Sequence, residues 1–173
     1  MSDLNKYYGK YRGIVLQNID PLQIGRMQVI VPDVSSLIPT SWAMPCTPIA
    51  GIQMGMYAVP AIGSSVWVEF EQGDPDYPIW VGCFWGSAAE VPLAVKAVAP
   101  VTPPIVIGNL TQSNIVISDV PVPAPYLLPA GGIVLQSGAS TVAVGPDGVT
   151  ITAPKVEING VTILMNKGAL MIT

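Results

Sequence analysis

The chain has 173 residues, half of them apolar and only 10% charged, with a formal net charge of −4 and no histidine. Soluble domains usually have about 25% charged residues, so we expect other subunits to cover much of this surface. The acidic balance argues against nucleic acid as a partner, because phosphate binding needs a basic footprint. The lack of histidine excludes nucleophilic catalysis that depends on a histidine base.

Two long stretches contain no charged residue, residues 34–68 and residues 120–146. Prolines and glycines interrupt both, whereas a membrane-spanning helix needs roughly 20 continuous apolar residues. The first residues lack the apolar core of a signal peptide, so we expect assembly in the cytoplasm of the producing cell. For Cys46 and Cys83, two buried thiols are favoured over a disulfide in this reducing compartment.

Residues 1–86 predict a small barrel of about five strands. Strands are expected at residues 7–18, 25–33, 63–71 and 78–85, and residues 41–45 and 55–59 flank an uncharged loop rich in proline and glycine. Two of them alternate cleanly between apolar and polar residues, which is typical of strands with one buried face. The alternation places Met27, Val29 and Val31 on one face of their strand, and Val66, Val68 and Phe70 on one face of theirs.

Residues 87–104 are rich in proline and are expected to form a semi-rigid linker. A short hairpin is predicted from residues 105–107 and 115–117. A second proline-rich stretch, residues 120–129, has no predicted place in the fold.

The tail, residues 131–173, alternates β-branched and polar residues in short bursts separated by turn residues. A ladder of such short strands leaves edges unpaired and one apolar face uncovered. One interpretation is the edge of an ordinary β-sandwich; the other is that copies of the chain wind around a common axis and cover that face. In the second case we expect the inward residues to be Val142, Val144, Val149, Ile151, Val156, Ile158, Val161 and Ile163.

Several acidic residues are candidates for an active site or a metal site. Glu69 and Glu71 lie on one strand face, where neighbouring acids usually form a solvated surface rather than a glycosidase pair. Glu71, Asp74 and Asp76 lack the ligand spacing of a calcium loop, and an Asx turn is favoured. We therefore expect no catalytic site, no metal site and no cofactor.

An ordered set of short motifs resembles the central spike proteins of contractile injection machines. This family includes phage baseplate assembly protein V, the valine-glycine-repeat (VgrG) spikes and the spikes of extracellular phage-tail-like particles. In the first half the matching residues are Gly13, Asp20-Pro21, Gly25-Arg26, the run VIVPD, Ser41-Trp42, Pro60, Gly63, Val66, Val68, Phe70, residues 73–75, Pro78, Gly82 and Trp85-Gly86. In the second half they are residues 115–119, 131–133, 140–144, 147–151, 154–159 and 168–170.

The resemblance implies an all-β trimer, with an N-terminal oligonucleotide/oligosaccharide-binding (OB) barrel and a C-terminal intertwined triple-stranded β-helix over residues 105–173. It implies a baseplate spike that docks on a hub protein and leads the inner tube through the target envelope. Two departures are clear: residues 87–104 are too few for the lysozyme domain of larger spikes, and the histidines that hold a tip metal in some short spikes are absent. A non-enzymatic acidic OB-fold adaptor or a carbohydrate-binding module is the alternative.

The last five residues are apolar, and three copies would expose a blunt apolar surface at the C-terminal end. The resemblance therefore also implies a small tip protein of the proline-alanine-alanine-arginine (PAAR) type. Its expected contacts are Ala169, Leu170, Met171, Ile172 and Thr173.

Overall fold

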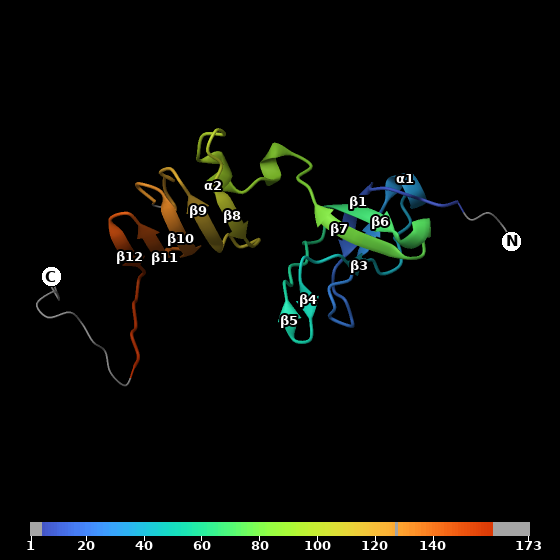
Figure 1. Ribbon diagram of the computed structural model, residues 1–173, viewed down its shortest axis with the longest axis horizontal. Coiled ribbons are helices and arrows are strands. Elements are labelled where there is room, and N and C mark those ends of the chain that lie inside the picture. Colours follow the sequence, from blue (N-terminus) through green and yellow to red (C-terminus); the bar gives the residue numbers. More distant parts are fainter. Residues whose placement is uncertain (1–4, 127, 161–173) are drawn as a thin grey trace, which may run out of the picture. The chain divides into compact units, whose positions relative to one another are not determined.

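The structure, a computed structural model, describes residues 5–126 and 128–160 (Figure 1). It divides into two compact units between Val91 and Pro92. Each unit is built around its own β-sheet, so the prediction of an all-β chain is confirmed.

The first unit is a curled five-stranded sheet with the strand order β2-β1-β6-β7-β3. Its strands are β1 (Tyr11–Gln17), β2 (Gln28–Ile30), β3 (Met44–Pro45), β6 (Ser65–Phe70) and β7 (Pro78–Cys83). The two outer strands approach each other again through an antiparallel bridge, in which the amides of Met27 and Ala43 donate to each other's carbonyls at 3.2 and 2.7 Å. The sheet therefore curls around its core, as expected for an OB fold.

The barrel core includes the apolar residues that the alternation placed on one face of each of two strands. Met27, Val29, Val31, Val66 and Val68 are fully buried. Around them lie Val15, Ala43, Phe70 and Trp80. The predicted inward faces of both strands are thus confirmed.

Three short elements interrupt or flank the barrel strands. The second strand is shorter than predicted because Pro32 opens the short helix α1 (Pro32–Ser35), a position that proline favours. Glu71 belongs to a 3₁₀ turn, η1 (Glu71–Gly73), so β6 ends at Phe70. A separate two-stranded hairpin, β4 (Ala50–Gly51) with β5 (Met54–Gly55), lies outside the five-stranded sheet.

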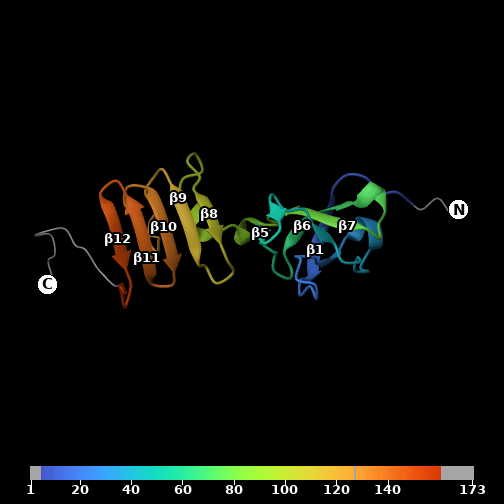
Figure 2. The same cartoon turned by 60° about the horizontal axis from the view of Figure 1, so that its bottom comes forward.

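The second unit is an antiparallel meander of five strands with the order β12-β11-β10-β9-β8 (Figure 2). The strands are β8 (Ile105–Gly108), β9 (Asn114–Ser118), β10 (Gly132–Ser137), β11 (Ser140–Gly145) and β12 (Gly148–Thr152). Each strand pairs with the next one along the same chain. One chain therefore builds a whole sheet on its own.

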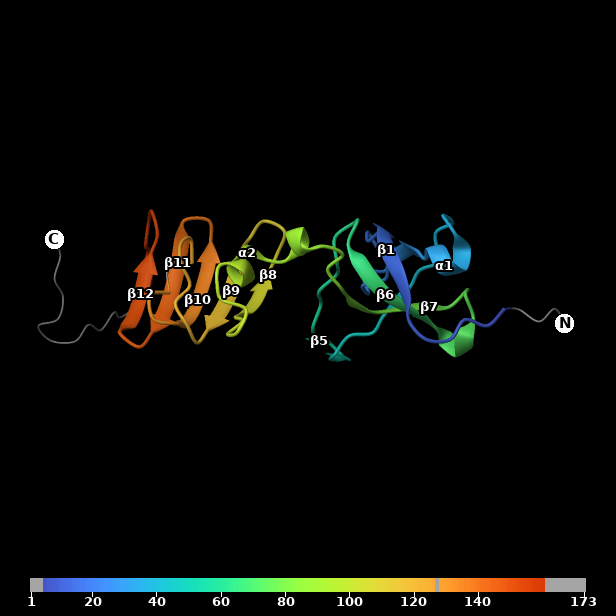
Figure 3. The same ribbon diagram turned by 90° about the horizontal axis from the view of Figure 1, so that it is seen from above.

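One face of this sheet is covered by two segments from outside it (Figure 3). The helix α2 (Leu93–Lys96) follows the 3₁₀ turn η2 (Ala88–Glu90) and contacts β8; Ala94 and Val98 pack on the sheet. Part of the stretch expected to be a linker thus lies in the core of the second unit. The other cover is the proline-rich stretch after β9, whose Val122, Tyr126 and Leu128 are all buried.

The proline-rich stretch is closed into a loop by its own backbone. Val122 and Leu128 form an antiparallel bridge, with their amides donating to each other's carbonyls at 2.8 and 3.1 Å. The Tyr126 amide donates to the carbonyl of Pro123 at 3.2 Å. The loop thereby satisfies backbone groups that would otherwise be buried unpaired, and it holds three apolar side chains against the sheet.

Candidate functional site

Two rows of apolar side chains cross the second sheet from β8 to β12 on the face that α2 and the proline-rich loop leave free. The register aligns one residue of each strand in each row. One row consists of Ile105, Ile117, Ile133, Val144 and Val149, and the other of Ile107, Ile115, Leu135, Val142 and Ile151. We refer to these ten residues as the two-row face.

The two-row face is open to solvent in a single chain. Nine of its ten side chains are exposed, and Val142 is half-buried. Side chains of this kind pack well on a pleated surface when another surface covers them, and a contiguous exposed apolar patch usually marks an interaction site. The arrangement fits association with another protein surface.

The opposite face differs from the two-row face in both composition and burial. Its central row runs Val106, Val116, Val134, Ala143 and Thr150. Val116 and Val134 are fully buried beneath α2 and the proline-rich loop, whereas Thr150 at the far edge is exposed. The covers therefore determine which face of the sheet remains available.

The structure places the predicted inward residues as follows. Val142, Val144, Val149 and Ile151 all lie on the two-row face. Val156 and Ile158 lie in the segment after β12 and are exposed. The predicted residues Val161 and Ile163, and the predicted tip contacts 169–173, lie outside the described residues.

Sequence reasoning missed six members of the two-row face: Ile105, Ile107, Ile115, Ile117, Ile133 and Leu135. The first four belong to two Ile-Val-Ile triplets, residues 105–107 and 115–117. The signal was present, because the outer isoleucines of such a triplet point to one face and the central valine to the other. A triplet that is apolar on both faces predicts a strand covered on both sides.

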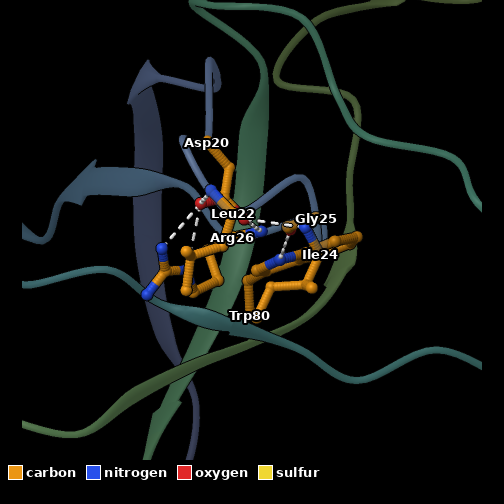
Figure 4. A network of polar contacts seen from close by, with 6 residues as sticks. All are labelled: Asp20, Leu22, Ile24, Gly25, Arg26 and Trp80. Atoms are coloured by element: carbon orange, nitrogen blue, oxygen red, sulfur yellow. Dashed lines mark hydrogen bonds and ion pairs between the residues drawn. The ribbon is translucent and has the colours of Figure 1, made fainter.

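A buried ionic network in the described part of the barrel is centred on Asp20 (Figure 4). The Asp20 carboxylate accepts hydrogen bonds from the amides of Leu22, Ile24 and Arg26 at 3.0, 3.0 and 3.2 Å. The Arg26 guanidinium donates to it as well, through Nε at 3.1 Å and Nη2 at 2.7 Å. The hydrogen bonds from the Arg26 side chain, with those from the backbone, hold the pKa of Asp20 well below its usual value.

The Asp20 network fixes a loop rather than forming a reactive centre. The indole Nε1 of Trp80 in β7 donates to the carbonyl of Gly25 at 3.0 Å, so the loop is tied to the barrel wall as well as to Asp20. Arg26 also lies over the ring of Trp42 at 5.4 Å. Every charged group in the network has a partner, which is typical of structural ion pairs.

The other acidic candidates are also engaged in local structure. Glu69 forms an ion pair with Lys10, and Glu71 is in η1, so the expectation that the two carboxylates share a strand face was wrong. The Asp76 amide donates to Asp74 Oδ1 at 3.1 Å, which is the predicted Asx turn. Within residues 5–126 and 128–160, no three His, Cys, Asp or Glu side chains are grouped so that they could hold a metal ion.

Cys46 and Cys83 are free thiols, but both are exposed, so the expectation that they are buried was wrong. Cys46 follows the last residue of the short strand β3, and Cys83 is the last residue of β7. Both therefore lie where the barrel wall ends. Partial desolvation raises the pKa of the Cys83 thiol.

In the part of the chain that the structure describes, no helix is long and apolar enough to cross a membrane.

Two family models match consecutive parts of the chain. Residues 11–85 match the type VI secretion system/phage-baseplate injector OB domain, and residues 104–171 match the phage baseplate V C-terminal trimerisation domain. The first match covers the curled barrel and the second covers the sheet with the two-row face. No curated protein matches the chain.

Proposed function

Because the chain belongs to the phage baseplate V family and has both the OB domain and the trimerisation domain of that family, we propose that it is the central spike of a contractile tail or injection-system baseplate. In this role it leads the inner tube through the envelope of the target cell. The observation that carries the proposal is the two-row face, which is apolar without interruption over five strands. A spike that pushes through an envelope needs a stiff shaft, and stacked sheets can provide one.

In the proposed trimer, three copies bring their two-row faces together around one axis. The strands of each sheet then run across the axis, and the apolar rows run along it. Completing the burial of each half-exposed Val, Ile or Leu side chain contributes on the order of 1 kcal/mol. Ten such side chains from each copy outweigh the entropy lost on association. A charged residue on this face would meet the same residue of the other two copies at the axis. None of the ten residues is charged.

We extend the same axis to the residues that follow β12. Val156 and Ile158 alternate with the polar residues Lys155, Glu157 and Asn159. Lys155 and Glu157 form an ion pair in the single chain, as suits a solvated outer face. In the proposal Val156, Ile158, Val161 and Ile163 continue the apolar core toward the C-terminus.

The two ends of the spike have different proposed partners. The baseplate hub protein binds at the barrel end, and a PAAR-like tip protein binds residues 169–173 at the other. Assembly takes place in the cytoplasm of the producing cell, and the finished spike is part of a tail particle. The target envelope is a transient partner, and the role requires neither an enzymatic reaction nor a cofactor.

The test is the oligomeric state of the full chain, measured by light scattering after size exclusion, for the wild type, Ile151→Asp and Thr150→Asp. Ile151 is 57% exposed in a single chain, so an aspartate there is compatible with the folded sheet but would place three carboxylates at the axis. Thr150 is the matched control, because it directly precedes Ile151 in β12 and faces the other side of the sheet. We expect three chains for the wild type and Thr150→Asp.

For Ile151→Asp we expect smaller species that retain β-sheet circular dichroism. A monomeric wild type would remove the spike proposal and favour a monomeric acidic adaptor or a carbohydrate-binding barrel. A trimeric wild type whose melting is unaffected by Ile151→Asp would leave the trimer but remove the two-row face as its core.

A further inference from the structure

The hairpin β4–β5 projects from the barrel as a separate two-stranded sheet (Figure 1). At its tip, Ile52 is 96% exposed. Further exposed apolar side chains flank the tip on both sides: Ile49, Met54, Met56 and Tyr57. An isolated two-stranded hairpin is marginally stable in water, and none of the described barrel residues covers Ile52.

A groove of about 590 Å³ runs along the hairpin, between its strands and the neighbouring barrel segments. Ile24 from the loop after β1 and Met44 and Cys46 from the β3 region form one side of the groove. The other side consists of hairpin residues such as Met54 and of Met56 and Tyr57, which follow β5. Methionine side chains adapt to the shape of an inserted apolar group. The groove is therefore suited to receive an aliphatic side chain such as isoleucine.

The outer wall of the groove is held in place by the Asp20 network. The Ile24 amide donates to Asp20 Oδ2 at 3.0 Å, and the neighbouring Gly25 carbonyl accepts from Trp80. A Cβ atom added at Gly25 would lie 3.5 Å from the Tyr57 ring, so this loop packs closely on the end of the hairpin. The groove is thus part of the folded barrel rather than a gap between loose loops.

Neither the projecting tip nor the groove carries an exposed charge. Residues 34–68, which contain the whole hairpin, have no charged residue. In the adjoining loop, Asp20 is buried against Arg26. A surface that binds a different protein commonly uses charges to select and orient its partner, whereas a surface repeated around a symmetry axis gains from having none.

From these observations we infer that Ile52 of one copy enters the groove of the next copy. The inference rests on the proposed trimer, because three tethered barrels are present at a high effective concentration with respect to each other. Ile52 does not line the groove, so the contact joins two different surfaces of neighbouring copies. Such a contact is heterologous, and three of them close a ring. The ring gives the barrel end of the spike its own contact between copies, separate from the two-row face.

Cys46 lines the groove and provides a native reporter of this contact. The test is oxidative cross-linking of purified full-length Ile52→Cys in a Cys83→Ser background, analysed on a non-reducing denaturing gel. A disulfide between copies produces covalent dimers and trimers, whereas a disulfide within one chain leaves a monomer band. Two controls carry the same Cys83→Ser change: Ile52→Cys with Cys46→Ser, which removes the groove thiol, and Leu37→Cys, which places a thiol at an 81% exposed position elsewhere on the barrel.

The expected result is covalent dimers and trimers for Ile52→Cys with Cys46 present, and at least a tenfold lower yield for both controls. Equal cross-linking of Leu37→Cys would overturn the inference, because it would show random collision of tethered barrels. Cross-linking that persists without Cys46 would also overturn it, because the tips would then meet each other rather than the groove. A trimer that gives no covalent species removes the ring alone, whereas a monomer in light scattering removes the spike proposal as well.

Discussion

The carboxylate of Asp20 and the guanidinium of Arg26 are joined by two hydrogen bonds, from Nε and from Nη2 to the same oxygen, Oδ1. The second carboxylate oxygen accepts the amides of Ile24 and Arg26. One buried side chain thus organises a turn of seven residues, including the wall of the groove described above. Since the pair replaces solvent around Asp20, the loss of either charge leaves the other poorly compensated.

We predict that this pair makes the barrel sensitive to acid. The pKa of Asp20 is lower in the folded protein than in the unfolded chain, where an aspartate titrates at about 4. Its contribution to stability is therefore fully present at neutral pH and is lost as the pH falls from about 4 toward the folded-state pKa. Asp20→Asn should lower the melting temperature at pH 7, and the gap to the wild type should narrow at pH 3.

The measurement is thermal unfolding at both pH values, with Asp33→Asn as the control. Asp33 is an exposed aspartate of the same unit, and its replacement should change neither melting temperature by more than about 2 °C, as is usual for surface substitutions. A gap between Asp20→Asn and the wild type that stays constant from pH 7 to pH 3 would show that the charge of Asp20 is not what stabilises the turn.

A second prediction concerns the proline-rich loop as a structural cover. Leu128 is 1% exposed beneath this loop, so Leu128→Ala should cost about 2–5 kcal/mol in the free energy of unfolding of the second unit. Leu110→Ala is the matched control, because Leu110 is 87% exposed in the turn between β8 and β9 and should cost less than about 0.5 kcal/mol. Urea unfolding of both variants measures the difference. Equal costs would mean that the loop is not part of the core.

A third prediction concerns the glycine at the start of β10. Gly132 has a φ of +123°, and a Cβ atom there would lie 2.1 Å from the carbonyl oxygen of Val144 in β11. Gly138 also has positive φ, at +57°, but a Cβ atom there would meet nothing within 4 Å. Gly138→Ala should cost about 1–2 kcal/mol from backbone strain alone. Gly132→Ala should cost more, since the backbone of β11 must move, and thermal unfolding of the pair compares them. A Gly132→Ala protein as stable as Gly138→Ala would contradict the close approach.

A fourth prediction concerns the C-terminal end of the spike. Deletion of residues 169–173 should leave the trimer intact, because the two-row face lies within residues 105–151. The same deletion should abolish retention of a tip protein, seen in a pull-down or in images of the particle. If images of the intact particle show Thr173 at the distal point with no further density, the tip protein does not exist and the chain itself is the tip.

The parts of the fold that follow from local pattern were predictable from the sequence. Period-two alternation identified the buried faces of β2 and β6, since every second residue of a half-buried strand must be apolar. The same reasoning placed Val142, Val144, Val149 and Ile151 on one face of the tail. These predictions succeeded because each depends on neighbours two residues away.

The parts that depend on distant segments were not predictable in this way. The proline-rich loop has no period, and its role is visible only once Val122, Tyr126 and Leu128 are seen packed beneath it on Val116 and Val134. The Ile-Val-Ile triplets indicate strands that are covered on both faces, but the sequence does not show which segment covers their central valines. Likewise, Cys46 and Cys83 are apolar enough for a core, but both lie at the ends of barrel strands, where they are exposed.

The in-order pairing of β8 to β12 has a consequence for how the protein is made. Every strand of this sheet pairs with the strand next to it in the chain, and contacts that are local in sequence form quickly. Each newly synthesised chain can therefore complete its sheet before it meets another copy, and the slow step of assembly becomes the collision between chains. The rate of that step rises with concentration, so chains that are made in a short burst meet their partners sooner than chains that are made slowly.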